Sequence, residues 1–273
     1  MTMRMPRLST VIAVGALAFL LLPFIVVIGA SFDTSNQFAI QFPPRNLSFM
    51  RYAEINPKYI DAVINSTIIA VIVSLLAAAF GLAASLGIVR GSLAGREIFK
   101  SFFRLPVQIP LIVTGAVFLQ FFSWIGAFTG FYPARSLAGV VLAHLIVTIP
   151  YAIGSITAML ERLHPSYEEA AQSLGASNWS VFWNVTFPSI RPGVAVGLFY
   201  AFAVSFGDVP IALFLVRDKT MTLPVEVFND MQVDFQPSIL ALSTLVIILS
   251  LVMMLVIQKL VGLDFVLSSR QKR

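Results

Sequence analysis

The chain has 273 residues, of which 58% are hydrophobic and 11% are charged, with a formal net charge of +5. Charged residues make up about 25% of an ordinary soluble domain, so this composition excludes a water-soluble globule of the same size and makes lipid the expected solvent for much of the surface. The sequence contains no cysteine, which excludes disulfides, thiolate catalysis and thiolate metal sites. Basic loops beside a membrane explain the positive charge, and we expect no nucleic-acid partner.

Six apolar windows along the chain are each long enough to cross a bilayer, which takes about 20 residues in a helix. They cover residues 8–32, 62–89, 105–134, 136–160, 192–216 and 235–258. The first window is longer than the core of about 7–15 residues that a signal peptide has, so we expect it to stay as a membrane anchor. We therefore expect an all-α transmembrane fold of about six spanning helices, with residues 1–273 as one domain.

The distribution of basic residues predicts the orientation of these spans. An even number of spans places both termini on one side of the membrane. Twelve of the 18 Lys and Arg residues fall on that side, in the termini and in the loops after the second and fourth windows. Basic residues favour the cytoplasmic face, so we expect both termini in the cytoplasm.

The loop between the fourth and fifth windows, residues 161–191, carries the signals of a short helix. Ser166 can cap its N-terminus, and Glu169 three positions later can complete a capping box. Gly175 can adopt the left-handed conformation that ends the helix. The polar face of this helix is acidic, whereas helices that lie on a membrane surface are usually rich in Lys and Arg. We therefore expect a surface that docks on a protein partner.

A second short helix is expected in the same loop. Ser177 or Asn178 can cap it, and Pro188 and Pro192 are expected to break the chain before the fifth span. We expect the two short helices to meet at an angle, in a loop on the cytoplasmic side of the membrane.

The loop resembles the EAA motif of ABC-importer permeases, which is Glu-Ala-Ala, three residues, Gly, nine residues and then Ile-x-Leu-Pro. In this chain the motif reads Glu169-Ala170-Ala171, Gly175 and Val185-Thr186-Phe187-Pro188. Asn65-Ser66-Thr67, at the start of the second span, also looks like these permeases. The resemblance covers nearly the whole chain.

The resemblance implies a MetI-like permease of a type I importer, multi-pass in a bacterial inner membrane. The residues that it implies for coupling to an ATPase are Glu168, Glu169, Ala170, Ala171, Gly175 and Pro188. It also implies three partners: a cytoplasmic ABC ATPase dimer that holds ATP and Mg, a second homologous permease, with a heterodimer favoured over a homodimer, and an extracytoplasmic solute-binding protein. The chain has no Gly-x-x-x-x-Gly-Lys-Ser/Thr loop, so we expect it to bind no cofactor and to be no enzyme.

The segment 203–210, followed by 222–225, resembles the spermidine/putrescine-type branch of this family, which implies a polyamine-like solute or another small organic cation. Asp208 is the one clear acid in a spanning window. One hypothesis is that Asp208, Phe206 and Phe202 line the translocation pathway. The alternative is that Asp208 caps a broken helix or pairs with a partner chain. For His144, a hydrogen-bonded packing role is favoured, and with two histidines in the chain no metal site is expected.

Two other classes of membrane protein compete with this interpretation. A secondary transporter or channel, not driven by ATP, needs more polar groups within the spans and usually an inverted repeat. A membrane-embedded enzyme needs a nucleophile and base, or a metal constellation, inside the spans. The sequence shows neither pattern, so the importer permease is preferred.

Overall fold

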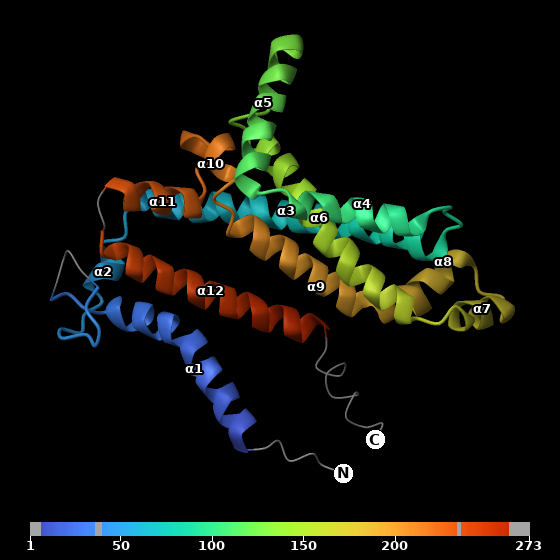
Figure 1. Cartoon of the computed structure of the whole chain (residues 1–273), viewed down its shortest axis with the longest axis horizontal. Coiled ribbons are helices and arrows are strands. Elements are labelled where there is room, and N and C mark those ends of the chain that lie inside the picture. The colour runs from blue at the N-terminus through green and yellow to red at the C-terminus, as the bar shows by residue number, and fades with distance from the viewer. Residues whose placement is uncertain (1–6, 36–39, 234–235, 262–273) are drawn as a thin grey trace. The chain divides into compact units, whose positions relative to one another are not determined.

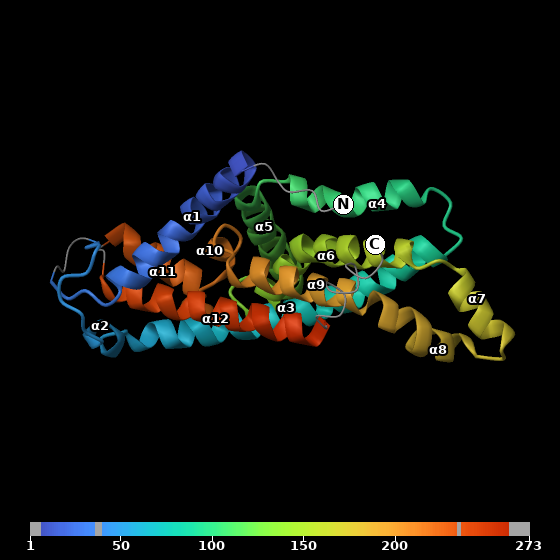
Figure 2. The same ribbon diagram turned by 90° about the horizontal axis from the view of Figure 1, so that it is seen from below.

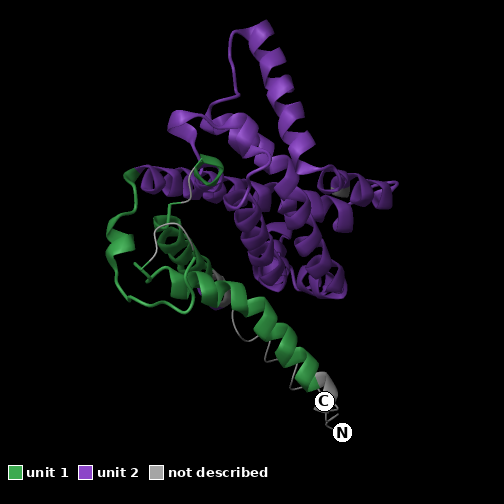
Figure 3. Cartoon of the chain, turned by 60° about the vertical axis from the view of Figure 1, so that its left-hand side comes forward, with its two compact units in different colours: residues 1–57, 229–253 green, residues 58–228, 254–273 purple. Residues whose placement is uncertain are grey.

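A computed structural model describes residues 7–35, 40–233 and 236–261 of the chain. These residues form helices, with one isolated antiparallel bridge between Asp33 and Leu47 (Figure 1). The chain ends, on which the predicted location of the termini depends, lie outside the described residues. Figure 3 shows two compact units, residues 1–57 with 229–253 and residues 58–228 with 254–273. The arrangement of the whole chain as one domain stays a prediction.

The first unit begins with α1 (Arg7–Ala30), which carries no charged residue after Arg7. It also contains the short helix α2 (Met50–Ala53) and most of α12 (Ser238–Val261). Most side chains of α1 are exposed within the chain, although nearly all of them are apolar. So many exposed apolar side chains make α1 unsuited to water, which agrees with the composition.

A buried carboxylate organises the connector between α1 and α2. The Oδ1 atom of Asp33 accepts backbone N–H groups from Arg45 at 2.9 Å and Asn46 at 3.0 Å, and its Oδ2 atom accepts the Ser35 hydroxyl at 2.6 Å. Hydrogen bonds to the ionised form favour it. The Asn46 amide and then the Ser35 hydroxyl therefore lower the pKa of Asp33 to about 2.

The second unit contains the longest helices of the chain (Figures 1 and 2). In chain order its elements are α3 (Pro57–Arg90), α4 (Arg96–Gln108), α5 (Leu111–Thr129), α6 (Leu137–Arg162), α7 (Ser166–Ser173), α8 (Asn178–Val181), the π-helical turn η1 (Phe182–Thr186), α9 (Phe187–Phe206), α10 (Ala212–Leu215), the 3-10 turn η2 (Asp218–Thr220) and the first part of α11 (Leu223–Val233). Helix α6 is central, because it packs against α9 along much of its length and against α4 at one end.

Small residues allow α6 and α9 to approach each other closely. A Cβ atom at Gly193 of α9 would lie 2.7 Å from both the Met159 Cγ and the Ser155 carbonyl oxygen of α6. Close helix contacts in membranes commonly depend on such small residues. The α6–α9 pair is therefore the rigid frame on which the loop between them is mounted.

The all-α class with several spanning helices is confirmed. Among the described residues, five helices are long and apolar enough to cross a membrane: Thr10–Ala30, Pro57–Arg90, Leu111–Thr129, Leu137–Arg162 and Asn178–Phe206. The sixth expected window holds α12, of which Ser238–Met253 is counted as a shorter apolar helix. Each predicted window overlaps one of these helices, and two differences, in the third and fifth windows, interrupt a predicted span.

Both differences have local causes. The third window, 105–134, begins with the end of α4, and the chain then breaks at Ile109 and Pro110 before α5 starts. Pro110 cannot donate to a continuing helix. The fifth window, 192–216, is interrupted after Phe206, where residues 207–211 leave the helix.

The expectation that Pro188 and Pro192 break the chain before the fifth span is wrong. Pro188 lies in the first turn of α9, and Pro192 lies inside that helix. Both prolines lie within the continuous helix Asn178–Phe206, with Pro188 just after the π-helical turn η1. Within a span, a proline removes one donor without preventing helical geometry. The helix therefore runs through both residues and reaches Phe206.

Candidate functional site

Helix α7 begins at a different residue from the one that the sequence predicts. Pro165 already has helical angles, φ −55° and ψ −28°, and is the N-cap without a side-chain bond. The Ser166 hydroxyl lies 2.8 Å from Nδ1 of His164 and does not cap the helix. The predicted capping box of Ser166 and Glu169 is therefore wrong, because the His164 ring occupies the hydroxyl.

The end of α7 and the start of α8 agree with the prediction. Gly175 has φ +87°, and the amides of Gly175 and Ala176 donate to carbonyls at the end of α7, as in a left-handed helix stop. The Ser177 side chain then caps α8 by accepting the N–H of Ser180 at 3.3 Å. From α8 the chain runs through η1 into α9 without a break.

Glu169, the first residue of the motif, and the adjacent Glu168 have different surroundings. The side chain of Glu168 is 16% exposed and accepts Nε of Arg90 at 2.7 Å and the Thr186 hydroxyl at 2.6 Å. Glu169 is exposed. The sequence assigns both glutamates to one role, whereas the structure separates an inward Glu168 from an outward Glu169. Arg90 and Thr186 have no signal in the sequence that predicts this contact.

Two residues of α7 and its C-cap form an exposed face, which we call the docking face: Tyr167, Ala170 and the C-cap Leu174. Their spacing of three and four residues places them on one side of a helix. Tyr167 is 63% exposed and Leu174 is 90% exposed. Ala171 is half-buried, whereas Pro188 is exposed on α9. Exposed apolar residues that gather on one face indicate a surface for a partner.

A buried polar cluster lies where α9 ends. Asp208 is outside any helix, and its Oδ1 accepts the backbone N–H groups of Ile211 at 3.0 Å and Ala212 at 2.9 Å. It therefore caps α10, and the description of Asp208 as a residue within a span is corrected. Nδ1 of His144 lies 2.9 Å from the Ser205 hydroxyl, and Nε2 lies 3.4 Å from Oδ1 of Asp208.

Phe202 and Phe206 are both buried, and their rings stack with centroids 5.6 Å apart. They lie on the last turns of α9, just before the break that holds Asp208. The helix-capping bonds of Asp208 and the hydrogen bond of His144 agree with the packing roles considered for these residues. The assignment of Asp208, Phe206 and Phe202 to a translocation pathway stays a prediction.

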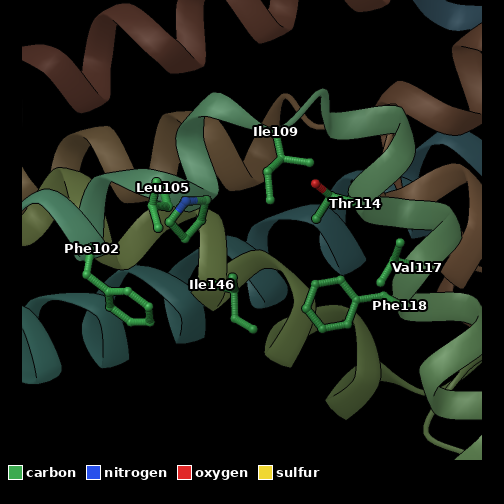
Figure 4. A pocket seen from close by; sticks show the side chains of 8 residues that line it. Phe102, Leu105, Ile109, Thr114, Val117, Phe118 and Ile146 are labelled. Carbon is green, nitrogen blue, oxygen red and sulfur yellow. The ribbon is translucent and has the colours of Figure 1, made fainter.

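Two cavities border α4. An apolar pocket of about 260 Å³ lies at the junction of α4 and α5 (Figure 4), where Phe102 and Leu105 approach Val117, Phe118 and Ile146. Its apolar walls make it unsuitable for a charged solute. No cluster of three metal-ligating side chains occurs within the part of the chain that the structure describes.

The second cavity, of about 210 Å³, lies between α4 and α6 and is lined partly by an ion cluster. Nζ of Lys100 lies 2.7 Å from Glu161 and 2.9 Å from Glu97. The hydrogen bonds of Glu161 and then of Glu97 raise the pKa of Lys100. Lys100 of α4 thus pairs with Glu161 of α6, which links the two helices.

Residues 77–263 match the family described as the binding-protein-dependent transport system inner membrane component. The putrescine transport system permease protein PotI of Escherichia coli is 30% identical over 240 residues, which cover 87% of this chain and 84% of that protein. The sulfate transport system permease protein CysW of Synechocystis sp. is 34% identical over 155 residues, which cover 54% of this chain and 56% of that protein. The chloroplastic sulfate permease 2 of Chlamydomonas reinhardtii is 30% identical over 202 residues, which cover 70% of this chain and 54% of that protein. This chain thus spans little more than half the length of these two sulfate permeases.

Solved structures share the fold at lower sequence identity. A bacterial ABC transporter for the acidic polysaccharide alginate has a TM-score of 0.62 at 16% identity, with 95% of this chain and 98% of that chain covered. The alginate transporter in complex with its pentasaccharide-bound periplasmic protein has a TM-score of 0.66 at 14% identity, with 93% and 92% covered.

Proposed function

Because the chain belongs to the family of binding-protein-dependent transport system inner membrane components, we propose that it is the membrane-spanning permease subunit of an ATP-driven bacterial importer. The loop 161–191 docks on a cytoplasmic ABC ATPase, which holds ATP and Mg. This chain binds no cofactor and carries out no chemical step. The docking face of α7, exposed between two spans, is the observation that carries the proposal.

Two further partners complete the proposed assembly. A second, homologous permease stands beside this chain in the inner membrane, with a heterodimer favoured, and both termini lie in the cytoplasm. An extracytoplasmic solute-binding protein delivers the solute. The excess of basic residues in the termini and the two loops on their side supports this orientation. The relative with a bound periplasmic protein supports the binding-protein partner by analogy of fold alone.

The proposed solute is a polyamine or another small organic cation. The permeases named for putrescine and for spermidine and putrescine match across most of their length. The buried carboxylate of Asp208 suits a cation better than an anion. Sulfate is the second candidate, because permeases named for sulfate are also among the relatives. The two solutes have opposite charge, so a transport assay separates them directly.

Asp208, Phe206 and Phe202 are proposed to border the translocation pathway. Asp208→Asn keeps an oxygen that can cap Ile211 and Ala212 but removes the negative charge. If the charge attracts the solute, this variant takes up less cation, while the amount of assembled complex stays at the wild-type level. The matched control is Asp218→Asn, which changes an exposed acid in η2. Unchanged uptake by Asp208→Asn with normal assembly would contradict the pathway role.

The test of the proposed function is reconstitution of the complex in liposomes with its ATPase, second permease and binding protein. We expect uptake that requires ATP, with radiolabelled putrescine, spermidine and sulfate compared as solutes. Uptake driven by an ion gradient without ATP would instead support the secondary transporter or channel.

Docking is tested by co-purification of the ATPase with this chain. Glu169→Lys, Gly175→Pro and Leu174→Glu are each expected to lose the ATPase, because they change the charge, the shape or the apolar contact of the loop. Leu93→Glu is the matched control, since Leu93 is an exposed leucine in the neighbouring loop between α3 and α4. An intact complex in all three loop variants would overturn the assignment.

A further inference from the structure

Glu168 connects the loop 161–191 to two spanning helices at once. One carboxylate oxygen accepts Nε of Arg90, the last residue of α3, at 2.7 Å. The other accepts the hydroxyl of Thr186, the last residue of η1 before α9, at 2.6 Å. Both oxygens of a single side chain on α7 are therefore used to join the ends of two other helices.

Arg90 extends this connection to a third helix. Its Nη2 donates to the carbonyl of Leu163 at 2.8 Å, and Leu163 is the C-cap residue that follows α6. A guanidinium next to the last carbonyls of a helix interacts favourably with the negative end of its dipole. The single side chain of Arg90 thus holds the end of α6 and the start of the loop in a fixed relation to α3.

The pair is partly shielded from water, since the Arg90 side chain is 24% exposed and that of Glu168 is 16% exposed. Charge-assisted hydrogen bonds of this length are stronger than neutral ones, and partial burial reduces their screening by salt. A fully exposed pair would restrain the loop only weakly. The contact is therefore suited to transmit a displacement of α7.

Thr186 lies where the loop joins the next spanning helix, so a displacement of Glu168 reaches that helix through it. It is buried, at 3% exposure, and it closes the π-helical turn that joins α8 to α9. Turns of this type are uncommon and occur frequently at functional sites. Figures 1 and 2 both show α8 continuing into α9, so a shift of Thr186 acts directly on the start of that span.

We propose that Arg90, Glu168 and Thr186 are positioning residues that couple movement of α7 to α3 and α9, while the neighbouring docking face holds the ATPase. This inference rests on the proposed function and assigns separate roles to two adjacent glutamates: Glu169 contributes to docking, and Glu168 transmits the motion. Loss of the cluster leaves the ATPase bound but lets it hydrolyse ATP without moving solute.

The experiment measures two quantities in the same reconstituted complex: the amount of ATPase that co-purifies, and the ATP hydrolysed per solute imported. Glu168→Ala and Arg90→Ala are each expected to keep the ATPase bound and to raise that ratio by at least about threefold, as the loss of a charge-assisted bond would allow. Thr186→Val, which removes one hydroxyl, is expected to change the ratio in the same direction by less.

Controls come from exposed residues outside the loop 161–191. Ser123→Ala changes a hydroxyl that donates to the Leu119 carbonyl within α5, and Arg135→Gln changes an exposed arginine between α5 and α6. Both are expected to keep the wild-type ratio. The charge-swapped double variant Arg90→Glu with Glu168→Arg is expected to recover part of the coupling that either single change loses.

The outcomes separate the two proposals. A wild-type chain that binds no ATPase, or that imports solute without ATP, would overturn the proposed function. A wild-type complex that couples normally, with variants that show an unchanged ratio, would overturn the role of the cluster alone. Variants that lose the ATPase together with coupling would also overturn it, because they would place Glu168 in docking.

Discussion

Asn65 of α3 donates its side-chain amide to the backbone carbonyls of Lys219 and Met221, each at 3.0 Å. The next residue, Ser66, accepts the backbone N–H of Leu223 at 2.8 Å. Leu223 is the first residue of α11, where an N–H group has no partner within the helix. Two features that stand far apart in the sequence, Asn65-Ser66-Thr67 and the segment 222–225, therefore form one contact.

Replacing Asn65 by Leu should destabilise this contact. The change removes two donated hydrogen bonds while keeping a side chain of similar size, and the expected loss is about 1–3 kcal/mol in the free energy of unfolding. Thermal unfolding of the purified chain in detergent measures it. The control is Thr67→Val, since the Thr67 hydroxyl donates to Val63 within α3. Equal midpoints for Asn65→Leu and Thr67→Val would show that the contact adds nothing.

The hydrogen bond between His144 and Ser205 predicts coupled effects of mutation. Both residues are buried, and the bond joins α6 to α9. Ser205→Ala leaves a buried imidazole nitrogen without its partner, which should cost about 1–3 kcal/mol. Leu at position 144 removes the need for that partner, so Ser205→Ala should cost less in the His144→Leu background. Strictly additive losses in this double-mutant cycle would mean that the two groups do not interact.

At Gly193, α6 and α9 lie too close together for a larger side chain to fit. A Cβ atom there meets the backbone of α6 at 2.7 Å, so Gly193→Ala should lower the stability of the chain by about 1–3 kcal/mol through overpacking. Gly154→Ala is the matched control on α6, because a Cβ atom at Gly154 meets no atom within 4 Å. Unfolding midpoints of the two variants check the prediction, and a tolerated alanine at both positions would argue against close α6–α9 packing.

The lowered pKa of Asp33 predicts that the stability of the folded chain depends on pH. Its pKa of about 2 lies below the ordinary value of 3.8, so the unfolded chain binds more protons between these two values. The stabilisation is complete above about pH 4 and is lost as the pH falls toward about 2. Asp33→Asn should therefore lower the unfolding midpoint at neutral pH, and the difference from wild type should shrink over that acidic range.

The control for Asp33 is Glu54→Gln, a change at an exposed acid in the same unit. It is expected to shift the midpoint little at any pH. A difference between Asp33→Asn and wild type that stayed constant down to about pH 2 would show that the Asp33 charge does not stabilise the connector.

The sequence predicted well what depends on a few consecutive residues. A long apolar run needs lipid wherever it lies, so the windows located the spanning helices. Gly175 was identified as a helix stop because only a residue without a side chain adopts φ +87° easily. Ser177 was identified as a possible cap for the same local reason. These signals require no knowledge of which segments meet.

Predictions were less accurate where two nearby groups can bind the same partner, or where a residue type allows a helix either to end or to continue. Ser166 is a good capping residue by type, yet its hydroxyl pairs with His164. Pro188 and Pro192 usually mark an end, yet α9 passes through both. In each case the residue type allows more than one local arrangement, so the type alone does not decide which one forms.

What the sequence alone determined is the membrane environment, the approximate spans and the motif that places the chain in its family. Only the tertiary structure decided that Glu168 turns inward to Arg90 while Glu169 stays exposed, and that Asp208 caps a helix beside His144. The physical reason is distance: hydropathy and turn preference act between neighbours in the chain, whereas Arg90 and Glu168 are 78 residues apart and meet only after the helices have packed.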